Sequence, residues 1–137
     1  IESENIWHMI IYTDSGKLDF NITNNEIEHK GIYYNKKEVV TVSGGTGSMT
    51  YSGSSYQALL VRVAVAGNAS YKSYIGVFLC IFVTSSSSCS NLHYFTNGGG
   101  VTPSISLSIG INSITITSDY DANYTVSIVN LGNNSLF

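Results

Sequence analysis

Two long segments near the middle of the chain, 56–66 and 71–84, are apolar on both faces and are joined by a short Gly67-Asn68 turn. Apolar, β-branched runs of this length predict buried strands that form a hairpin. An exposed strand as apolar as 75–83 would be an aggregation hazard. We therefore expect this hairpin to lie in the centre of a sheet, covered by a second sheet or by another subunit.

The remaining segments alternate apolar and polar residues and show no sustained helical period, which predicts minimal helix. Segments at the C-terminal end alternate strictly across short links, so we expect an antiparallel β-meander there. Its strands are predicted at 104–109, 113–118 and 123–131. Further strands are predicted at 5–13, 17–23, 31–34, 38–43 and 92–96, with a hairpin turn at 35–37 and loops at 24–30 and 44–55. About nine or ten strands predict one all-β domain over residues 1–137, an antiparallel β-sandwich or jelly roll.

Charged residues make up 11% of the chain, where about 25% is usual. The net charge is −3, so the chain lacks the basic surface of a nucleic-acid or anionic-membrane partner. Abundant aromatic and β-branched residues exclude disorder. The longest apolar run, 75–83, is far shorter than the roughly 20 residues of a spanning helix, so no membrane span is expected.

The chain begins at Ile1 without a Met, which predicts a processed or excised product whose signal peptide has been removed. Its two cysteines, Cys80 and Cys89, flank a serine run, and a strand followed by a return could bring them together as a disulfide. The alternative is that Cys80 is a buried small hydrophobe and Cys89 a free thiol. We expect an extracellular or cell-surface location, with a virion surface as the alternative.

Four Asn-x-Ser/Thr sequons begin at Asn21, Asn68, Asn123 and Asn133. An Asn- and Ser-rich chain produces about three such triplets by chance, so their positions matter more than their number. The predicted strands and turns leave all four accessible. The sequence therefore predicts glycosylation at one or more of them.

No catalytic or metal-binding motif emerges from the sequence. The histidines, His8, His29 and His93, lack a metal-ligand spacing, and the glycine-rich segment 44–48 lacks the Lys of a phosphate-binding loop. The alternating oxygen ligands of 119–123 begin like a calcium loop but lack its later Gly and Glu. We expect no enzyme activity, no cofactor and no metal, although distant acids that meet as a glycosidase pair are an open alternative.

The apolar strands and the scarcity of charge favour a non-enzymatic structural or adhesive protein that assembles with copies of itself, as a pilus-like filament. One route is donor-strand complementation, in which residues 1–13 serve as an exchanged strand. The candidate donor residues are Ile6, Trp7, Met9, Ile10, Ile11 and Tyr12. The same segment also suits an ordinary strand of its own sandwich.

Two alternatives stay open. The C-terminal strands at 104–131 resemble, in general style, the receptor-binding heads of viral or phage fibres, which implies a trimer that presents loops to a receptor. A lectin-like module that binds host or cell-surface glycans is the other alternative, because tyrosines can stack on sugars. The candidate tyrosines are Tyr33, Tyr34, Tyr51, Tyr56, Tyr71, Tyr74 and Tyr94, each of which also suits a core or subunit contact.

Overall fold

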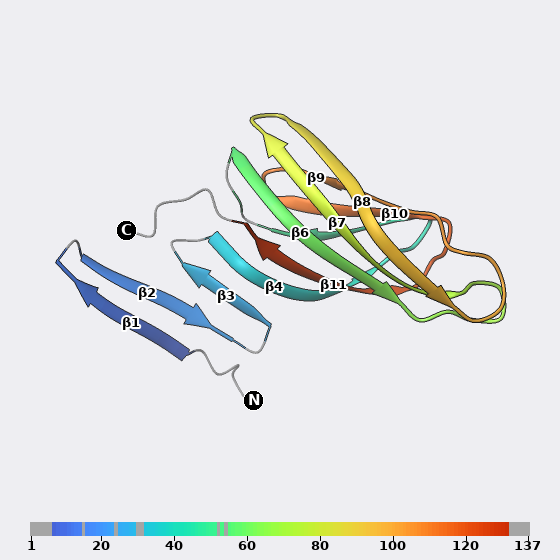
Figure 1. Cartoon of the computed structure of the whole chain (residues 1–137), viewed down its shortest axis with the longest axis horizontal. Coiled ribbons are helices and arrows are strands. Elements are labelled where there is room, and N and C mark those ends of the chain that lie inside the picture. Colours follow the sequence, from blue (N-terminus) through green and yellow to red (C-terminus); the bar gives the residue numbers. More distant parts are fainter. Residues whose placement is uncertain are drawn as a thin grey trace.

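The fold is an antiparallel β-sandwich, which confirms the predicted class (Figure 1). A computed structural model describes residues 7–14, 16–23, 25–29, 32–51, 53 and 55–131, and within these ranges the chain forms eleven strands and no helix. Accordingly, these ranges contain no helix that is long and apolar enough to cross a membrane.

The strands form one large sheet and one small sheet. In spatial order, the eight-stranded sheet consists of β1 (Trp7–Thr13), β2 (Gly16–Ile22), β3 (Glu26–His29), β4 (Ile32–Thr41), β11 (Asn123–Asn130), β6 (Tyr56–Val65), β7 (Ser73–Val83) and β8 (Ser86–Asn97). The three-stranded sheet consists of β5 (Thr46–Thr50), β10 (Ser113–Ser118) and β9 (Ile105–Ile109). The small sheet packs on one face of the large sheet, and β1 and β2 lie to one side of the sandwich (Figure 1).

The core lies between the small sheet and β4, β11, β6 and β7. Along each of these strands every second side chain points into the core, because successive side chains of a strand point to opposite faces of the sheet. On β6 the fully buried side chains are Leu59, Val61 and Val63, and on β10 Ile114 and Ile116 are equally buried. Each such side chain contributes roughly 1.5 to 3 kcal/mol of hydrophobic stabilisation.

One end of the sandwich is closed by polar contacts. The Asp121 carboxylate accepts hydrogen bonds from the backbone N–H groups of Gly44 and Gly45, at 2.7 and 3.0 Å. Both glycines have positive φ angles, which residues with a Cβ rarely adopt, and this turn carries the chain from the large sheet to the small one. Beside it, Tyr124 donates to the Tyr120 carbonyl oxygen at 2.7 Å, and its hydroxyl pairs with Ser118 Oγ at 2.8 Å.

Four segments differ from the predicted pattern. The predicted loop 24–30 contains β3, and the predicted hairpin across 35–37 is wrong because β4 runs unbroken from Ile32 to Thr41. Lys36 is accommodated within this strand: its Nζ donates to the Thr50 carbonyl oxygen at 2.9 Å and lies beside Glu26 and Glu38. The predicted connection 44–55 contains β5, and the predicted strand 92–96 is the end of a longer β8, which begins with residues 86–88 paired to β7.

The predicted C-terminal meander is present only in its first two strands. β9 and β10 pair antiparallel, whereas β11 leaves them and inserts between β4 and β6 in the large sheet. Strict alternation marks all three segments as half-buried strands but does not say which sheet each one joins.

Candidate functional site

The strands β1 and β2 form a hairpin, called the arm here, that extends the large sheet beyond the small one (Figure 1). The arm joins the rest of the sheet through only two register pairs, Asn21 with Glu28 and Ile22 with Ile27. The Trp7 and Tyr12 side chains are 69% and 78% exposed. Because a two-stranded hairpin is marginally stable alone, the arm is a part of the molecule that would gain from cover.

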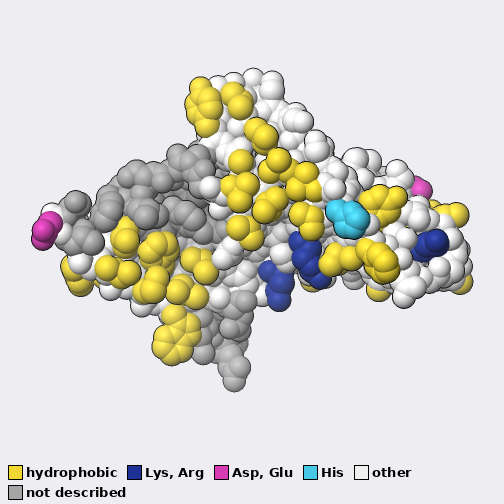
Figure 2. All heavy atoms as spheres, in the orientation of Figure 1, with side chains coloured by type: hydrophobic (Ala, Val, Ile, Leu, Met, Phe, Trp, Pro, Cys, Tyr) yellow, Lys and Arg dark blue, Asp and Glu magenta, His cyan; other side chains and the backbone are white. Residues whose placement is uncertain are grey.

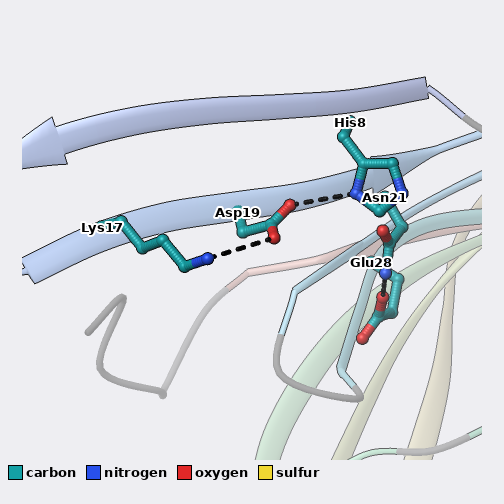
Figure 3. Close-up of polar contacts among 5 residues, drawn as sticks. All are labelled: His8, Lys17, Asp19, Asn21 and Glu28. Carbon is teal, nitrogen blue, oxygen red and sulfur yellow. Dashed lines mark hydrogen bonds and ion pairs between the residues drawn. The ribbon is translucent and has the colours of Figure 1, made fainter.

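One face of the arm is polar (Figure 3). The His8 ring nitrogen Nδ1 lies 3.2 Å from Asp19 Oδ1, and Lys17 Nζ lies 4.0 Å from Asp19 Oδ2. Asn21 Nδ2 donates to Glu28 Oε2 at 2.6 Å. Each acid of this face thus has a polar side chain beside it, and the face points to the same side of the sheet as the small sheet.

The other face of the arm is apolar and continues across the whole large sheet. Residues that pair across antiparallel strands share a face, so the register defines rows of neighbouring side chains. One row crosses all eight strands through Trp7, Ile22, Ile27, Asn35, Val129, Leu60, Leu79 and Ser90. It is apolar in six of its eight members. We call the side of the large sheet that carries this row, opposite the small sheet, the outer face.

The outer face is exposed and rich in hydrophobic side chains (Figure 2). They gather over β1 and β2 and again over β6, β7 and β8, with Lys and Arg side chains and a His nearby (Figure 2). The register places Lys37, Arg62 and His93 in one row, and the described strands bring no acid to this face. The exposed large hydrophobic residues here include Trp7, Met9, Ile11, Val39, Tyr56, Ile75, Val77, Ile81, Val83, Phe95 and Val129.

The outer face carries an open hollow of about 250 Å³ where β6, β7 and β8 lie side by side. Its lining includes Arg62, Ile75, Phe95 and Asn97. The Phe95 ring is 66% exposed. The hollow thus combines an apolar floor with one guanidinium and one amide.

The candidate donor residues lie in β1, except Ile6, which lies outside the described residues. In this structure β1 pairs with β2 of its own chain over seven register pairs, at the free edge of the large sheet. The remaining candidates Trp7, Met9, Ile10, Ile11 and Tyr12 are all exposed. The donor role therefore stays a prediction.

Cys80 and Cys89 are free thiols in the structure and lie directly opposite each other on β7 and β8. A hydrogen bond between the two thiols, together with burial, raises the pKa of Cys80, and the same bond lowers the pKa of Cys89. Cα atoms of directly paired antiparallel residues are about 4.5 to 5.5 Å apart, within the range that a disulfide spans. The disulfide stays a prediction, and the register is compatible with it.

Mild oxidation is expected to join Cys80 to Cys89 within one chain. The closed loop is short, so the cross-link is expected to stabilise the fold by about 2 to 3 kcal/mol. The intact mass would fall by about 2 Da as two thiol hydrogens are lost, and urea unfolding of the oxidised and reduced forms would give the stability difference. Cys89→Ser should abolish both changes, and dimers linked through disulfides would contradict the pairing.

The asparagines of the four sequons differ in the burial and hydrogen bonding of their side-chain amides. Asn21 lies half-buried in β2 with its amide nitrogen bonded to Glu28. Asn68 is exposed, and its Oδ1 accepts from the backbone N–H groups of Ser70 and Tyr71. Asn123 is exposed at the start of β11, and Asn133 lies outside the described residues. Glycosylation stays a prediction, for which Asn68 and Asn123 are the better placed acceptors.

The tyrosines and the acids take mainly structural positions. Tyr51 and Tyr74 are buried and Tyr71 stacks on Tyr120 with ring centroids 4.5 Å apart, whereas Tyr56 and Tyr94 are exposed. The Tyr33 and Tyr34 side chains lie outside the described part. Asp119 and Asp121 accept hydrogen bonds from loop backbone, and no three His, Cys, Asp or Glu side chains of the described residues gather as a metal site.

Sequence reasoning identified the apolar strands but not the continuous outer face. The face depends on β11 lying between β4 and β6, which aligns Val129 with Leu60. A long-range pairing of this kind leaves no local signal. The double-sided apolarity of 75–83 was the one available signal, and it could not tell which side the core would take.

The fold and the outer face define the class of this protein as an antiparallel β-sandwich with an extended sheet. No protein-family model matches the chain, and no curated protein is significantly similar. Among solved structures it is similar to the tailspike protein of the Acinetobacter phage vB_ApiP_P1, with 17% identity and a TM-score of 0.47. The overlap covers 73% of this chain and 22% of the tailspike chain.

Proposed function

We propose that this protein is a non-enzymatic structural subunit of an extracellular fibre and that it assembles with copies of itself through the outer face. The observation that carries the proposal is the apolar row that crosses all eight strands with no covering element among the described residues. Monomeric proteins seldom expose apolar patches of more than a few hundred Å², and larger patches mark interaction sites.

The size of the outer face supports a second copy as its partner. Eight strands at about 4.8 Å spacing and a height of about 20 Å give a face of roughly 770 Å². A stable interface buries about 800 Å² on each partner, so the face has the area that a specific contact needs. It also carries few charges, and burying an unpaired charge is costly. The Lys37, Arg62 and His93 row is expected to stay hydrated at the rim of the contact, because the described strands bring no acid to this face.

The test is to place two lysines on the outer face and to measure particle mass. Ile75→Lys with Ile81→Lys, together called the face variant, introduces two ammonium groups at exposed positions of β7, where the charges already on this face have the same sign. We expect the particle mass from light scattering to fall at least twofold relative to the unsubstituted chain, because the contact would bury unpaired charges.

The matched control places two lysines on the exposed side of the small sheet. Thr46→Lys with Ser108→Lys puts one ammonium group on β5 and one on β9, at residues that face solvent and are not paired with each other, so the assembly should persist. An unsubstituted chain that stays monomeric at high concentration, or a face variant with unchanged mass, would overturn the proposal. Electron microscopy of the assembly distinguishes an open filament from a closed oligomer, and a closed oligomer would contradict the filament form.

A second candidate function, a receptor- or glycan-binding head, is favoured by the hollow on the outer face. An exposed aromatic ring beside a guanidinium and an amide suits a sugar that carries a carboxylate. This candidate requires the hollow to stay open, whereas assembly through the outer face would cover it. Binding to a glycan array that Phe95→Ala abolishes would favour the head over the fibre subunit.

A further inference from the structure

The large sheet has two free edges of unusual character. β8 is twelve residues long and contains no Asp, Glu, Lys, Arg or Pro, and the other edge, β1, also contains none. Within the described residues, no strand pairs with the outer side of either one. Proteins normally protect long edges with charges, prolines or short strands, because an open edge is a template for another strand.

The one irregularity in β8 does not close its edge. Val77 pairs with His93 and Phe78 with Asn91, so Leu92 is an extra residue at a β-bulge. The bulge separates two regular stretches, 86–91 and 93–97. Side chains on both sides of the second stretch are apolar and exposed, with Phe95 on the outer face and Tyr94 on the opposite side.

Strand direction makes the two edges complementary. All seven neighbouring pairs in the large sheet are antiparallel, so β1 and β8 run in opposite directions. A second copy placed beside β8 in the same orientation therefore presents its β1 antiparallel to β8. In that orientation Trp7, Met9 and Ile11 of the second copy lie on the same side as Phe95, so the apolar outer face continues from one copy to the next.

We propose that β8 of one copy accepts β1 of the next copy as a ninth, antiparallel strand, a contact that rests on the self-assembly proposed above. Main-chain hydrogen bonds supply affinity in such β-augmentation, and alternate side chains supply specificity. A contact between two different edges is head-to-tail, so it leaves a free β1 at one end and a free β8 at the other and can grow. Each copy would add about 38 Å along the fibre, because it contributes eight strands at about 4.8 Å spacing.

The test uses two complementary variants in the background of the face variant, so that only the edges can associate. Ile10→Lys with Tyr12→Lys blocks the donor β1 at exposed residues of its polar face, away from the apolar row. Leu92→Lys with Tyr94→Lys blocks the acceptor β8 at exposed residues that do not belong to the apolar row either. Each variant alone is expected to stay monomeric.

Mixing the two variants in equal amounts is expected to double the particle mass, since a free β8 of one then meets a free β1 of the other. Self-association of the donor-blocked variant alone would overturn the proposal, because β8 would then pair without β1. An unchanged mass after mixing would also overturn it. These outcomes are independent of the outer-face proposal, which fails when the face variant itself leaves the mass of the assembly unchanged.

Hydrogen exchange of the unsubstituted chain gives a second measurement that requires no substitution. Raising the protein concentration should slow exchange of β1 and β8 amides together, by at least tenfold, while core amides of β6 stay unchanged. Protection that rises in β8 and not in β1, or in neither, would overturn the proposal.

Discussion

Leu59→Ala is expected to destabilise the fold by about 3 kcal/mol. Leu59 is fully buried on β6 opposite Cys80, and its truncation removes apolar contacts and leaves a cavity in the core. A loss of this size is a large part of the 5 to 15 kcal/mol by which domains are stable, and it corresponds to a drop in Tm of roughly 10 °C. Urea unfolding and calorimetry would measure both quantities.

The control for this prediction lies on the opposite face of the same hairpin. Ile81 is 44% exposed on β7, so Ile81→Ala should cost less than about 1 kcal/mol in the monomer. Equal losses from the two variants would mean that the hairpin is covered on both sides within one chain.

Tyr124→Phe is expected to destabilise the fold by about 1 to 3 kcal/mol. The buried hydroxyl of Tyr124 donates to the Tyr120 carbonyl oxygen and pairs with Ser118 Oγ, and its removal leaves buried polar groups with fewer partners. Tyr12→Phe, at a highly exposed position of the arm, should stay within about 0.5 kcal/mol of the unsubstituted chain. Urea unfolding of both variants at pH 8 is the measurement.

Tyr124→Phe is also expected to change how the free energy of unfolding falls as the pH rises above 8. Burial raises the pKa of Tyr124 above its ordinary value of 10.0, so the unfolded chain loses this proton at lower pH than the folded chain does. The stability contribution is complete below pH 10 and declines as the pH rises through the folded pKa. Tyr124→Phe should therefore lose less stability between pH 8 and pH 11, and an equal loss in both proteins would contradict this assignment. Burial also raises the pKa of Tyr74, which contributes equally to the pH dependence of stability in the variant and in the unsubstituted chain.

The sequence predicted those parts of the fold whose signal is local. Alternation identified β2, β9, β10 and β11, and the double-sided apolarity of 56–84 identified the central hairpin β6 and β7. Segments that derive their structure from a partner strand were missed. The serines at the start of β8 and the polar centre of β4 have low strand preference, and both are held by pairing with β7, β3 and β11.

The sequence predicted the individual apolar strands of the candidate site but not the face that they form together. The sequence predicted that β7 needs cover and that β1 is a candidate donor strand, but the alignment of their exposed residues into one face depends on the order of eight strands. That order includes the insertion of β11 beside β4, which are about 80 residues apart in the sequence. Packing sets this pairing, and neither segment alone carries a signal for it.

The weak attachment of the arm has a consequence for the order of events after synthesis. Among the described residues, two register pairs and the Asn21–Glu28 hydrogen bond join the arm to β3, so detaching the arm is expected to cost less free energy than global unfolding. The sandwich is therefore expected to fold as a unit before the arm is fixed in place. In the assembly proposed above, folding of the sandwich and pairing of the arm with another copy would then be separate steps in time.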